Sequence, residues 1–185
     1  HQWFGDYVTC KDWSHLWLNE GFATYYTHLF EGHKFGRDAM LYRLHGDATG
    51  RVLTQDKDTK PIVFNGYKNP MQQFDYRSYP KGSWVLHMLR SQLGEELYRK
   101  CIKSYLEKHA LSSVVSDDLR QVIEQHSGRP MDRFFDQWLY HPRHPDLKIT
   151  YKWMPKEKLA RVTIKQTQTT NDDVVLYRFP TKLRF

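Results

Sequence analysis

One carboxylate in an apolar helical segment is the side chain whose chemistry most needs an explanation. Apolar residues recur at helical spacing across residues 13–30, and Glu20 falls on the side that holds Trp13, Trp17 and Ala23. An ionised carboxylate there costs several kcal/mol unless a positive charge pairs with it, and this segment has no Lys or Arg. Three explanations stay open: partial exposure, a distant Arg, or a divalent cation, since carboxylate with imidazole is a common zinc shell.

Two stretches around Glu20 match a known family. They read His-Gln-Trp-Phe-Gly-Asp-Tyr-Val-Thr at residues 1–9 and Trp-Leu-Asn-Glu-Gly-Phe-Ala at residues 17–23. Both resemble the zinc aminopeptidase family of alanyl aminopeptidase (aminopeptidase N), a gluzincin group. In that family eighteen residues separate the second His of H-E-x-x-H from the Glu that completes the shell, as eighteen separate His1 from Glu20. The resemblance therefore implies that His1 and Glu20 bind Zn²⁺.

The same resemblance implies that the site is incomplete in this chain. The first His and the general-base Glu would stand four and three positions before residue 1. In the family, that Glu takes a proton from a water whose pKa the zinc lowers. The upstream Gly-x-Met-x-Asn motif, which faces the substrate's α-amine, is missing too. We therefore expect a fragment that begins at the second His of H-E-x-x-H and is inactive alone.

A third match surrounds Tyr79. Residues 77–90 read Arg-Ser-Tyr-Pro-Lys-Gly-Ser-Trp-Val-Leu-His-Met-Leu-Arg and resemble the family's Y-x-K-G segment at the start of a helix. The resemblance implies that the Tyr79 hydroxyl donates a hydrogen bond to the oxyanion of the tetrahedral intermediate, a form of electrostatic catalysis. The alternative is that Tyr79, one of 12 tyrosines, only packs at the helix end. We expect Lys81 and Gly82 to be structural.

Two further polar residues lie near the expected zinc ligands. Asn19 precedes Glu20 and is a candidate to orient its carboxylate, because metal ligands need their remaining lone pairs fixed. A helix-packing role for Asn19 is equally open. Asp6 is a candidate brace at the exit of the catalytic helix, or a turn residue that accepts backbone hydrogen bonds.

Helical periodicity dominates the chain up to a Pro-containing joint at residues 141–146. It predicts helices over 13–30, 38–46, the stretch after Pro80 up to a stop at Gly94, 95–108, 116–128 and 130–141, with mostly loop over 47–78. The fold class is therefore mainly α. The resemblance implies that residues 1–144 are the helical half of a thermolysin-like catalytic domain and that residues 145–185 begin a β-sandwich.

The period changes to two after the joint. Residues 147–153, 161–165 and 174–185 alternate apolar and polar side chains, which predicts half-buried strands with lysines facing water. Residues 1–142 carry 18 basic and 17 acidic side chains, whereas residues 143–185 carry 10 and 4. We attribute the tail's charge to a solvated sheet face, because a nucleic-acid groove would place aromatics on the same face as the charges.

Composition excludes several classes of protein. The 185 residues are 39% hydrophobic and 15% aromatic, which is too apolar for a disordered chain. No apolar run approaches the roughly 18 residues that a membrane span requires. Two cysteines are too few for a disulfide framework. We expect peptide substrates with a free N-terminus and no nucleic acid. A metal-free, aminopeptidase-like scaffold that binds protein partners is the alternative, and His-Glu-x-x before His1 would exclude it.

Overall fold

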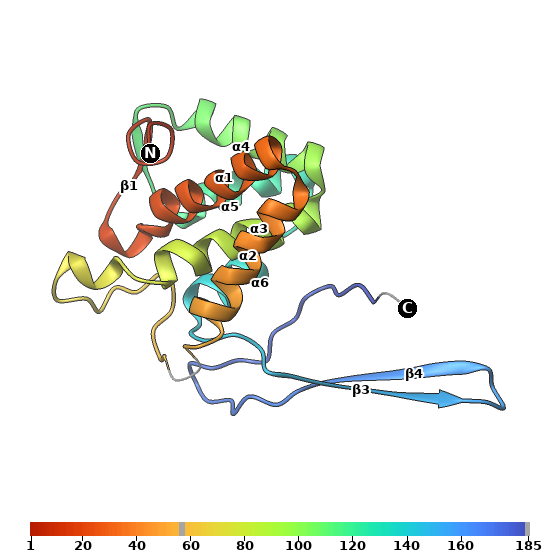
Figure 1. Cartoon of the computed structure of the whole chain (residues 1–185). Helices are drawn as coiled ribbons and strands as arrows, with labels where there is room; N and C mark the ends of the chain where they lie inside the picture. Colours follow the sequence, from red (N-terminus) through yellow and green to blue (C-terminus); the bar gives the residue numbers. More distant parts are fainter. Residues whose placement is uncertain (56–57, 184–185) are drawn as a thin grey trace.

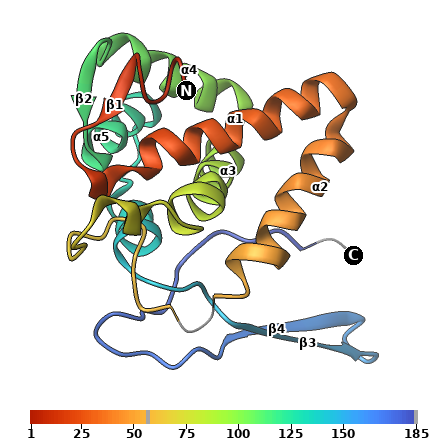
Figure 2. The ribbon, with the colours of Figure 1, turned by 60° about the vertical axis from the view of Figure 1, so that its left-hand side comes forward.

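Helices make up most of the structure. The computed structural model describes residues 1–55 and 58–183, and Figures 1 and 2 show the helices gathered into one body from which a long β-hairpin projects. No helix in these two ranges is both long and apolar enough to cross a membrane. The α-helices are α1 (Trp17–Phe35), α2 (Arg37–Asp47), α3 (Gly82–Leu93), α4 (Glu95–Lys108), α5 (Ser116–Ser127) and α6 (Asp132–Phe135).

Helix α1 begins later and ends later than its apolar pattern predicts. Residues 13–15 form a separate 3₁₀ turn, whose start is capped where the Asp12 carboxylate accepts a hydrogen bond from the Ser14 N–H at 2.9 Å. Trp13 is therefore outside α1 and 43% exposed. The helix continues to Phe35 because only Gly36, at φ 96°, breaks it.

Glycine also sets the boundary between α3 and α4, as the sequence predicts. Gly94 has φ 82°, a backbone conformation that side chains disfavour, and its N–H donates to the Arg90 carbonyl at 2.9 Å. The two helices thus turn without a loop. Helix α1 packs against both α3 and α2, and α2 runs back along α1 (Figure 2).

A single hydrophobic core holds the helices together. It contains the apolar faces of α1, α3, α4 and α5 and the aromatic residues that follow Pro130. Trp17 is 1% exposed, and its indole N–H donates to the Ser116 hydroxyl at 2.9 Å, so α1 and the start of α5 are joined by a buried hydrogen bond. Phe22 at the centre of α1 stacks on Phe4 with ring centroids 4.2 Å apart.

Two short strands tie the N-terminal segment to the body. Strand β1 (Val8–Cys10) pairs in parallel with β2 (Ser112–Val114), with Thr9 opposite Ser113. Neither strand was expected, because three residues are too few to show a period. Their pairing places the segment that contains His1 beside the first turns of α1 (Figure 2).

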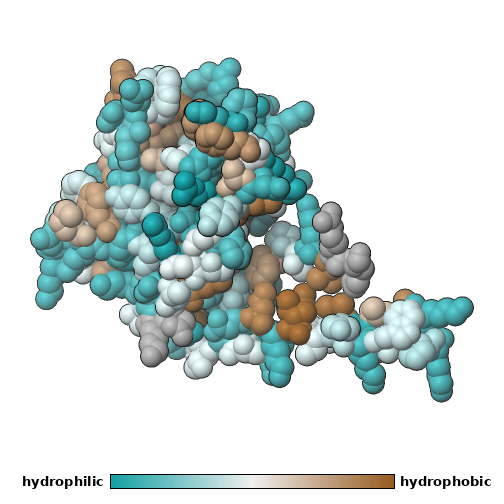
Figure 3. All heavy atoms as spheres, in the orientation of Figure 1, coloured by the Kyte–Doolittle hydropathy of each residue, from teal (hydrophilic) through white to brown (hydrophobic). Residues whose placement is uncertain are grey.

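The hairpin of β3 (Leu147–Met154) and β4 (Leu159–Gln166) confirms two of the expected strands, but not their burial. The strands are antiparallel, with Ile149 opposite Ile164. Both faces are exposed: Tyr151, on the apolar face, is 86% exposed. The prediction of half-buried strands is wrong for this structure because nothing in the described residues covers the hairpin, which extends away from the body (Figure 1). Figure 3 shows hydrophobic residues gathered where the hairpin meets the body.

The third expected strand, over residues 174–185, is not formed by its described part, residues 174–183. This segment is extended, but side chains satisfy its backbone: Gln166 accepts from the Tyr177 N–H at 2.9 Å, and Gln137 accepts from the Arg178 N–H at 2.9 Å. Tyr177 is buried against Trp138, with ring centroids 4.7 Å apart. The alternation therefore marks a strap packed on the helices. Residues 184 and 185 lie outside the described residues.

The expected loop between α2 and α3 contains three short turns. They are a π turn at Ala48–Val52, a 3₁₀ turn at Pro70–Gln73 and a π turn at Arg77–Lys81 that leads directly into α3. The last of these carries Tyr79 and packs against α1.

Candidate metal centre

His1 and Glu20, the two expected zinc ligands, lie side by side. Nε2 of His1 is 3.1 Å from Oε2 of Glu20, and Nδ1 of His1 is 3.0 Å from the Phe4 carbonyl oxygen. A carbonyl oxygen only accepts hydrogen bonds, so Nδ1 carries the hydrogen in that contact. In a neutral imidazole, Nε2 then presents its lone pair to the carboxylate. Two lone pairs at this distance require a cation between them, either a proton or a metal ion.

The spacing of the two atoms fits a metal ion. Two ligands bound at about 2.0–2.2 Å to a tetrahedral zinc lie about 3.3–3.6 Å apart, and the observed 3.1 Å is slightly shorter. The Phe4 carbonyl also fits, because a metal-binding histidine commonly donates its other ring N–H to such an acceptor, which fixes the tautomer and the ring. Among residues 1–55 and 58–183, no third His, Cys, Asp or Glu completes the group.

The groups around Glu20 bear on the three explanations for its carboxylate: partial exposure, a distant Arg or a divalent cation. Its side chain is 12% exposed, and within the described chain no Lys or Arg pairs with it. Its neighbours are the His1 imidazole and the Tyr79 hydroxyl, which hydrogen-bonds the carboxylate. Burial raises the pKa of Glu20, and the Tyr79 hydrogen bond opposes that shift. The N-terminal ammonium also lowers the pKa of Glu20. A distant Arg therefore does not account for the carboxylate, which is partly exposed and faces the His1 imidazole.

Tyr79 reaches Glu20 because two backbones meet without side chains between them. A methyl group added at Gly21 of α1 would lie 3.0 Å from the carbonyl carbon of Gly82 and 3.2 Å from the Ser78 carbonyl oxygen. This glycine contact brings the Arg77–Lys81 turn against α1. Burial and the Glu20 charge both raise the pKa of Tyr79, so its phenol keeps the proton it needs to donate.

The three residues face one cleft. His1, Glu20 and Tyr79 line a cleft of about 510 Å³ over the middle of α1. Its other walls are aromatic and small side chains from the N-terminal segment and α1: Trp3, Phe4, Ala23, Thr24, Tyr26, Thr27 and Phe30. A carboxylate, an imidazole and a phenol therefore converge on one open space, which suits a metal-assisted reaction on a polar substrate.

Asn19 and Asp6 do not contact the Glu20 carboxylate through their side chains. Oδ1 of Asn19 accepts from the Cys10 N–H at 3.0 Å and its Nδ2 lies 3.4 Å from the Thr9 hydroxyl, so Asn19 joins α1 to β1. The backbone N–H of Asp6 donates to the His1 carbonyl at 3.1 Å. In the part of the chain that the structure describes, the Asp6 carboxylate has no hydrogen bond or ion pair. Asn19 and Asp6 therefore contact the segment that carries His1, and neither orients the Glu20 carboxylate.

Lys81, which the sequence predicted to be structural, is a buried cation. It is 5% exposed, and within the described residues its ammonium has no hydrogen-bond partner. Asp58, Asp75 and Arg77 are the charged groups that face it. Burial lowers the pKa of Lys81 to about 8.

Three features of the site were missed from the sequence. They are the Phe4 carbonyl that fixes His1, the contact between Gly21 and Gly82, and the buried network around Arg77. Both glycines belong to the matched motifs, since Gly21 follows Glu20 and Gly82 follows Lys81. Their place in the motifs was the one sign in the sequence that they matter. The carbonyl and the network depend on contacts that only the folded chain creates.

Comparison with known proteins decides the family. The model of the peptidase family M1 domain matches residues 1–138. The chain belongs to peptidase family M1. The expected resemblance to zinc aminopeptidases is thereby confirmed, and Zn²⁺ is the cofactor of this family.

Its relatives include enzymes and a protein named for a partner. The chain is 38% identical over 154 residues to tricorn protease-interacting factor F2 of Thermoplasma volcanium, covering 80% of this chain and 20% of that protein. It is 34% identical over 171 residues to aminopeptidase M1-A of Oryza sativa subsp. japonica, covering 91% and 19%. The chain thus spans about a fifth of the length of the curated relatives it matches.

Solved structures share the fold. A variant of an M1 zinc metallopeptidase from Deinococcus radiodurans, bound to a Tyr-Ser-Ala substrate, superposes with a TM-score of 0.64 at 27% identity, covering 75% of this chain and 30% of that one. Legionella pneumophila aminopeptidase A in complex with aspartic acid gives a TM-score of 0.75 at 24% identity, covering 90% and 18%. At that identity the second match speaks for the fold alone.

Proposed function

We propose that this chain is part of a zinc aminopeptidase that removes N-terminal residues from peptides. In this proposal residues 1–144 are the helical half of a thermolysin-like catalytic domain, and residues 145–185 begin a β-sandwich. The observation that carries the proposal is the contact of His1 Nε2 with the largely enclosed Glu20 carboxylate, 3.1 Å apart. Such a contact is stable only with a cation between the two atoms.

His1 and Glu20 are the zinc ligands in this proposal. A catalytic zinc shell needs three protein ligands; in the family, the other imidazole and the general-base carboxylate belong to the H-E-x-x that precedes the histidine matched by His1. When bound, zinc supplies a Lewis acid and lowers the pKa of a bound water. Phe4 holds the His1 ring through Nδ1 and keeps Nε2 directed at Glu20. Asn19 and Asp6 hold the segment that carries His1.

Tyr79 stabilises the negative charge that develops on the substrate oxygen. Its hydroxyl lies against Glu20, so it borders the place where a carbonyl of the substrate meets the ligands. A phenol that remains protonated is a hydrogen-bond donor, and a donor fixed before the reaction costs no reorganisation in the transition state. The Glu20 hydrogen bond keeps the ring in place while the cleft is empty.

Peptides with a free N-terminus are the proposed substrates. The names of the rice relatives and the Tyr-Ser-Ala complex of the Deinococcus metallopeptidase support this class. Protein partners are a second possibility, because the Thermoplasma relative is named for its interaction with tricorn protease. A metal-free scaffold would have no use for a carboxylate, an imidazole and a phenol that face one cleft, which favours the enzyme.

Two substitutions in the full-length protein test the proposal. Glu20→Gln should reduce bound zinc and abolish hydrolysis of aminoacyl-p-nitroanilides. Tyr79→Phe should keep the zinc and lower kcat by about 100-fold with little change in KM, as for the loss of one oxyanion donor. Full zinc occupancy in Glu20→Gln would exclude Glu20 as a ligand, and an unchanged kcat in Tyr79→Phe would exclude the proposed role of the phenol.

A further inference from the structure

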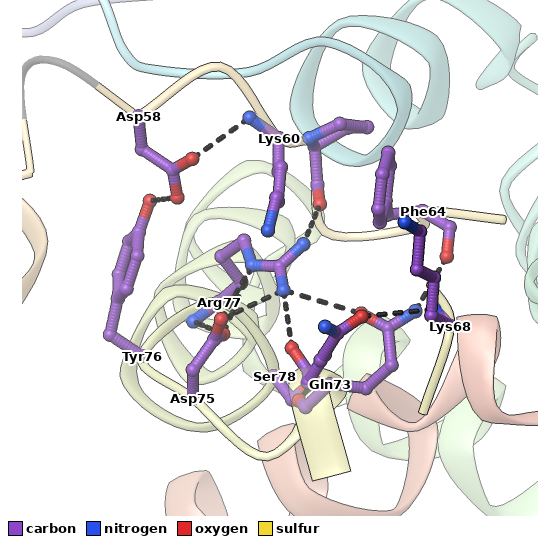
Figure 4. A network of polar contacts seen from close by, with 11 residues as sticks. Asp58, Lys60, Phe64, Lys68, Gln73, Asp75, Tyr76, Arg77 and Ser78 are labelled. Carbon is purple, nitrogen blue, oxygen red and sulfur yellow. Dashed lines mark hydrogen bonds and ion pairs between the residues drawn. The ribbon is translucent and has the colours of Figure 1, made fainter. Parts of the chain in front are cut away.

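The turn that carries Tyr79 is built on a buried arginine. Arg77 is 1% exposed, and Figure 4 shows its guanidinium enclosed by groups from the loop that precedes it. Nε donates to both carboxylate oxygens of Asp75, at 3.1 and 2.9 Å, and Nη2 lies 2.7 Å from the same carboxylate. A planar, two-pronged contact of this kind orients the guanidinium as well as neutralising it.

The remaining donors of Arg77 reach three other points of the loop. Nη1 donates to the Pro61 carbonyl at 3.1 Å, and Nη2 donates to the Gln72 carbonyl at 2.8 Å and to Oε1 of Gln73 at 3.3 Å. The ring of Phe64 lies 5.8 Å from the guanidinium carbon (Figure 4). One side chain therefore ties residues 61, 72 and 75 to the turn, and a lysine, which lacks the fork, could not make the same set of bonds.

The backbone of the turn depends on such anchors. Pro80 lies inside it and has no N–H to donate. The Tyr79 N–H reaches the Asp75 carbonyl only at 3.3 Å. The neighbour of Arg77, Ser78, is held in the same way, since its hydroxyl donates to the Gln73 carbonyl at 2.7 Å. The side chains of Arg77 and Ser78 thus point into the loop, whereas the side chain of the next residue, Tyr79, points to the cleft.

We propose that Arg77 is a positioning residue for Tyr79: its buried guanidinium fixes the turn so that the phenol lies beside Glu20. Arg77 does not line the cleft and therefore acts on the reaction only through Tyr79. The inference rests on the proposed function of Tyr79. It adds a residue whose removal should disturb the transition state without touching the zinc ligands or the substrate.

A double-mutant cycle in the full-length enzyme tests this coupling. Arg77→Met should lower kcat by about 10- to 100-fold, the effect of a reactive group displaced by about 1 Å, while KM and bound zinc stay within about twofold. In a Tyr79→Phe background, the same change should lower kcat by less than about threefold, because the phenol it positions is gone. Equal losses in both backgrounds would overturn the inference and leave the role of Tyr79 intact.

Two further variants separate positioning from stability. Asp75→Asn removes the charge of the main partner, which is 37% exposed at its side chain, and serves if Arg77→Met does not fold. It should lower kcat less, and this loss should also vanish with Tyr79→Phe. Arg43→Met, which breaks the pair between Arg43 on α2 and Glu31 on α1, is the matched control and should leave kcat unchanged.

The outcomes distinguish the inference from the proposed function. A lower melting temperature in Arg77→Met with unchanged kcat would show a merely structural arginine and overturn the inference. An unchanged kcat in Tyr79→Phe alone would refute the role of Tyr79 in the proposed function, and the inference about Arg77 would fail with it.

Discussion

The contact between Gly21 and Gly82 predicts that alanine substitution has opposite effects on the unfolding free energy at two helical glycines, Gly21 and Gly46. Alanine in a helix interior is more favourable than glycine by about 1 kcal/mol. At Gly21, however, the new methyl group would lie 3.0 Å from the Gly82 carbonyl carbon and 3.1 Å from its Cα, both backbone atoms that cannot move aside. Overpacking of this kind costs about 1–3 kcal/mol. Gly21→Ala should therefore have no net stabilising effect or should destabilise the chain by up to about 2 kcal/mol.

Gly46 on α2 is the matched control. It is also helical, and a methyl group there meets nothing within 4 Å. Gly46→Ala should stabilise the chain by about 0.5–1 kcal/mol. The propensity gain is common to both variants, so the difference between their free energies of unfolding, about 1–3 kcal/mol, isolates the contact.

Urea unfolding followed by tryptophan fluorescence measures that difference, and kcat of the full-length enzyme measures its consequence at the site. Gly21→Ala should lower kcat, because the turn with Tyr79 is pushed away from Glu20, whereas Gly46→Ala should not. Equal stabilisation by both alanines would refute the backbone contact and the account of how Tyr79 reaches the cleft.

Three other measurements test the packing and the electrostatics. Burial lowers the pKa of Lys81 from its ordinary 10.5 to about 8, so at this group the unfolded chain binds more protons between these two values. Lys81 should therefore contribute a rise in stability of roughly 3 kcal/mol from pH 8 to 10.5, whereas the buried cysteines and tyrosines with raised pKa values contribute a fall. In urea unfolding across that range, the stability of the unsubstituted protein relative to Lys81→Met should rise by this amount, and Lys100→Met, on the exposed side of α4, should follow the unsubstituted protein. Trp17→Ala should cost about 3–5 kcal/mol of unfolding free energy, since the side chain is buried. Trp153→Thr in the exposed hairpin should change the unfolding free energy of residues 1–185 by less than about 0.5 kcal/mol.

The helices were predictable because their signals are local. The apolar stripes of α3 and α4 and the stop at Gly94 depend on residues a few positions apart, and the positive φ of Gly94 shows why the stop is a glycine. The start of α1 was less predictable. Its apolar residues continue into the 3₁₀ turn at Trp13, and the Asp12 cap outweighs the periodicity there.

Contacts between distant residues account for what the sequence did not reveal. Strands β1 and β2 are three residues each and lie about a hundred residues apart, so neither has a period of its own. The alternation over residues 174–183 is the same for a strand and for a strap whose partners are glutamine side chains. An alternation with a period of two shows which side chains lie on the same face of an extended segment. It does not show whether a neighbouring strand or other side chains bond its backbone.

The residues that share the cleft were predictable, but the contacts that support them were not. The spacing of His1 and Glu20 and the segment around Tyr79 identified the three residues that share the cleft. Nothing in that pattern indicated that Arg77 would be buried, since a charged residue is usually exposed. Its partners are a carboxylate two residues away and carbonyls that the loop brings close only in the folded protein.

Anomalous diffraction at the zinc absorption edge, on crystals of the full-length protein, tests the central claim most directly. The account predicts one strong peak about 2.0–2.2 Å from both Nε2 of His1 and Oε2 of Glu20. It also predicts that the Nδ1 contact with Phe4 is retained. Crystals grown with zinc that show no peak there, and a proton or a basic side chain between the two atoms instead, would contradict it.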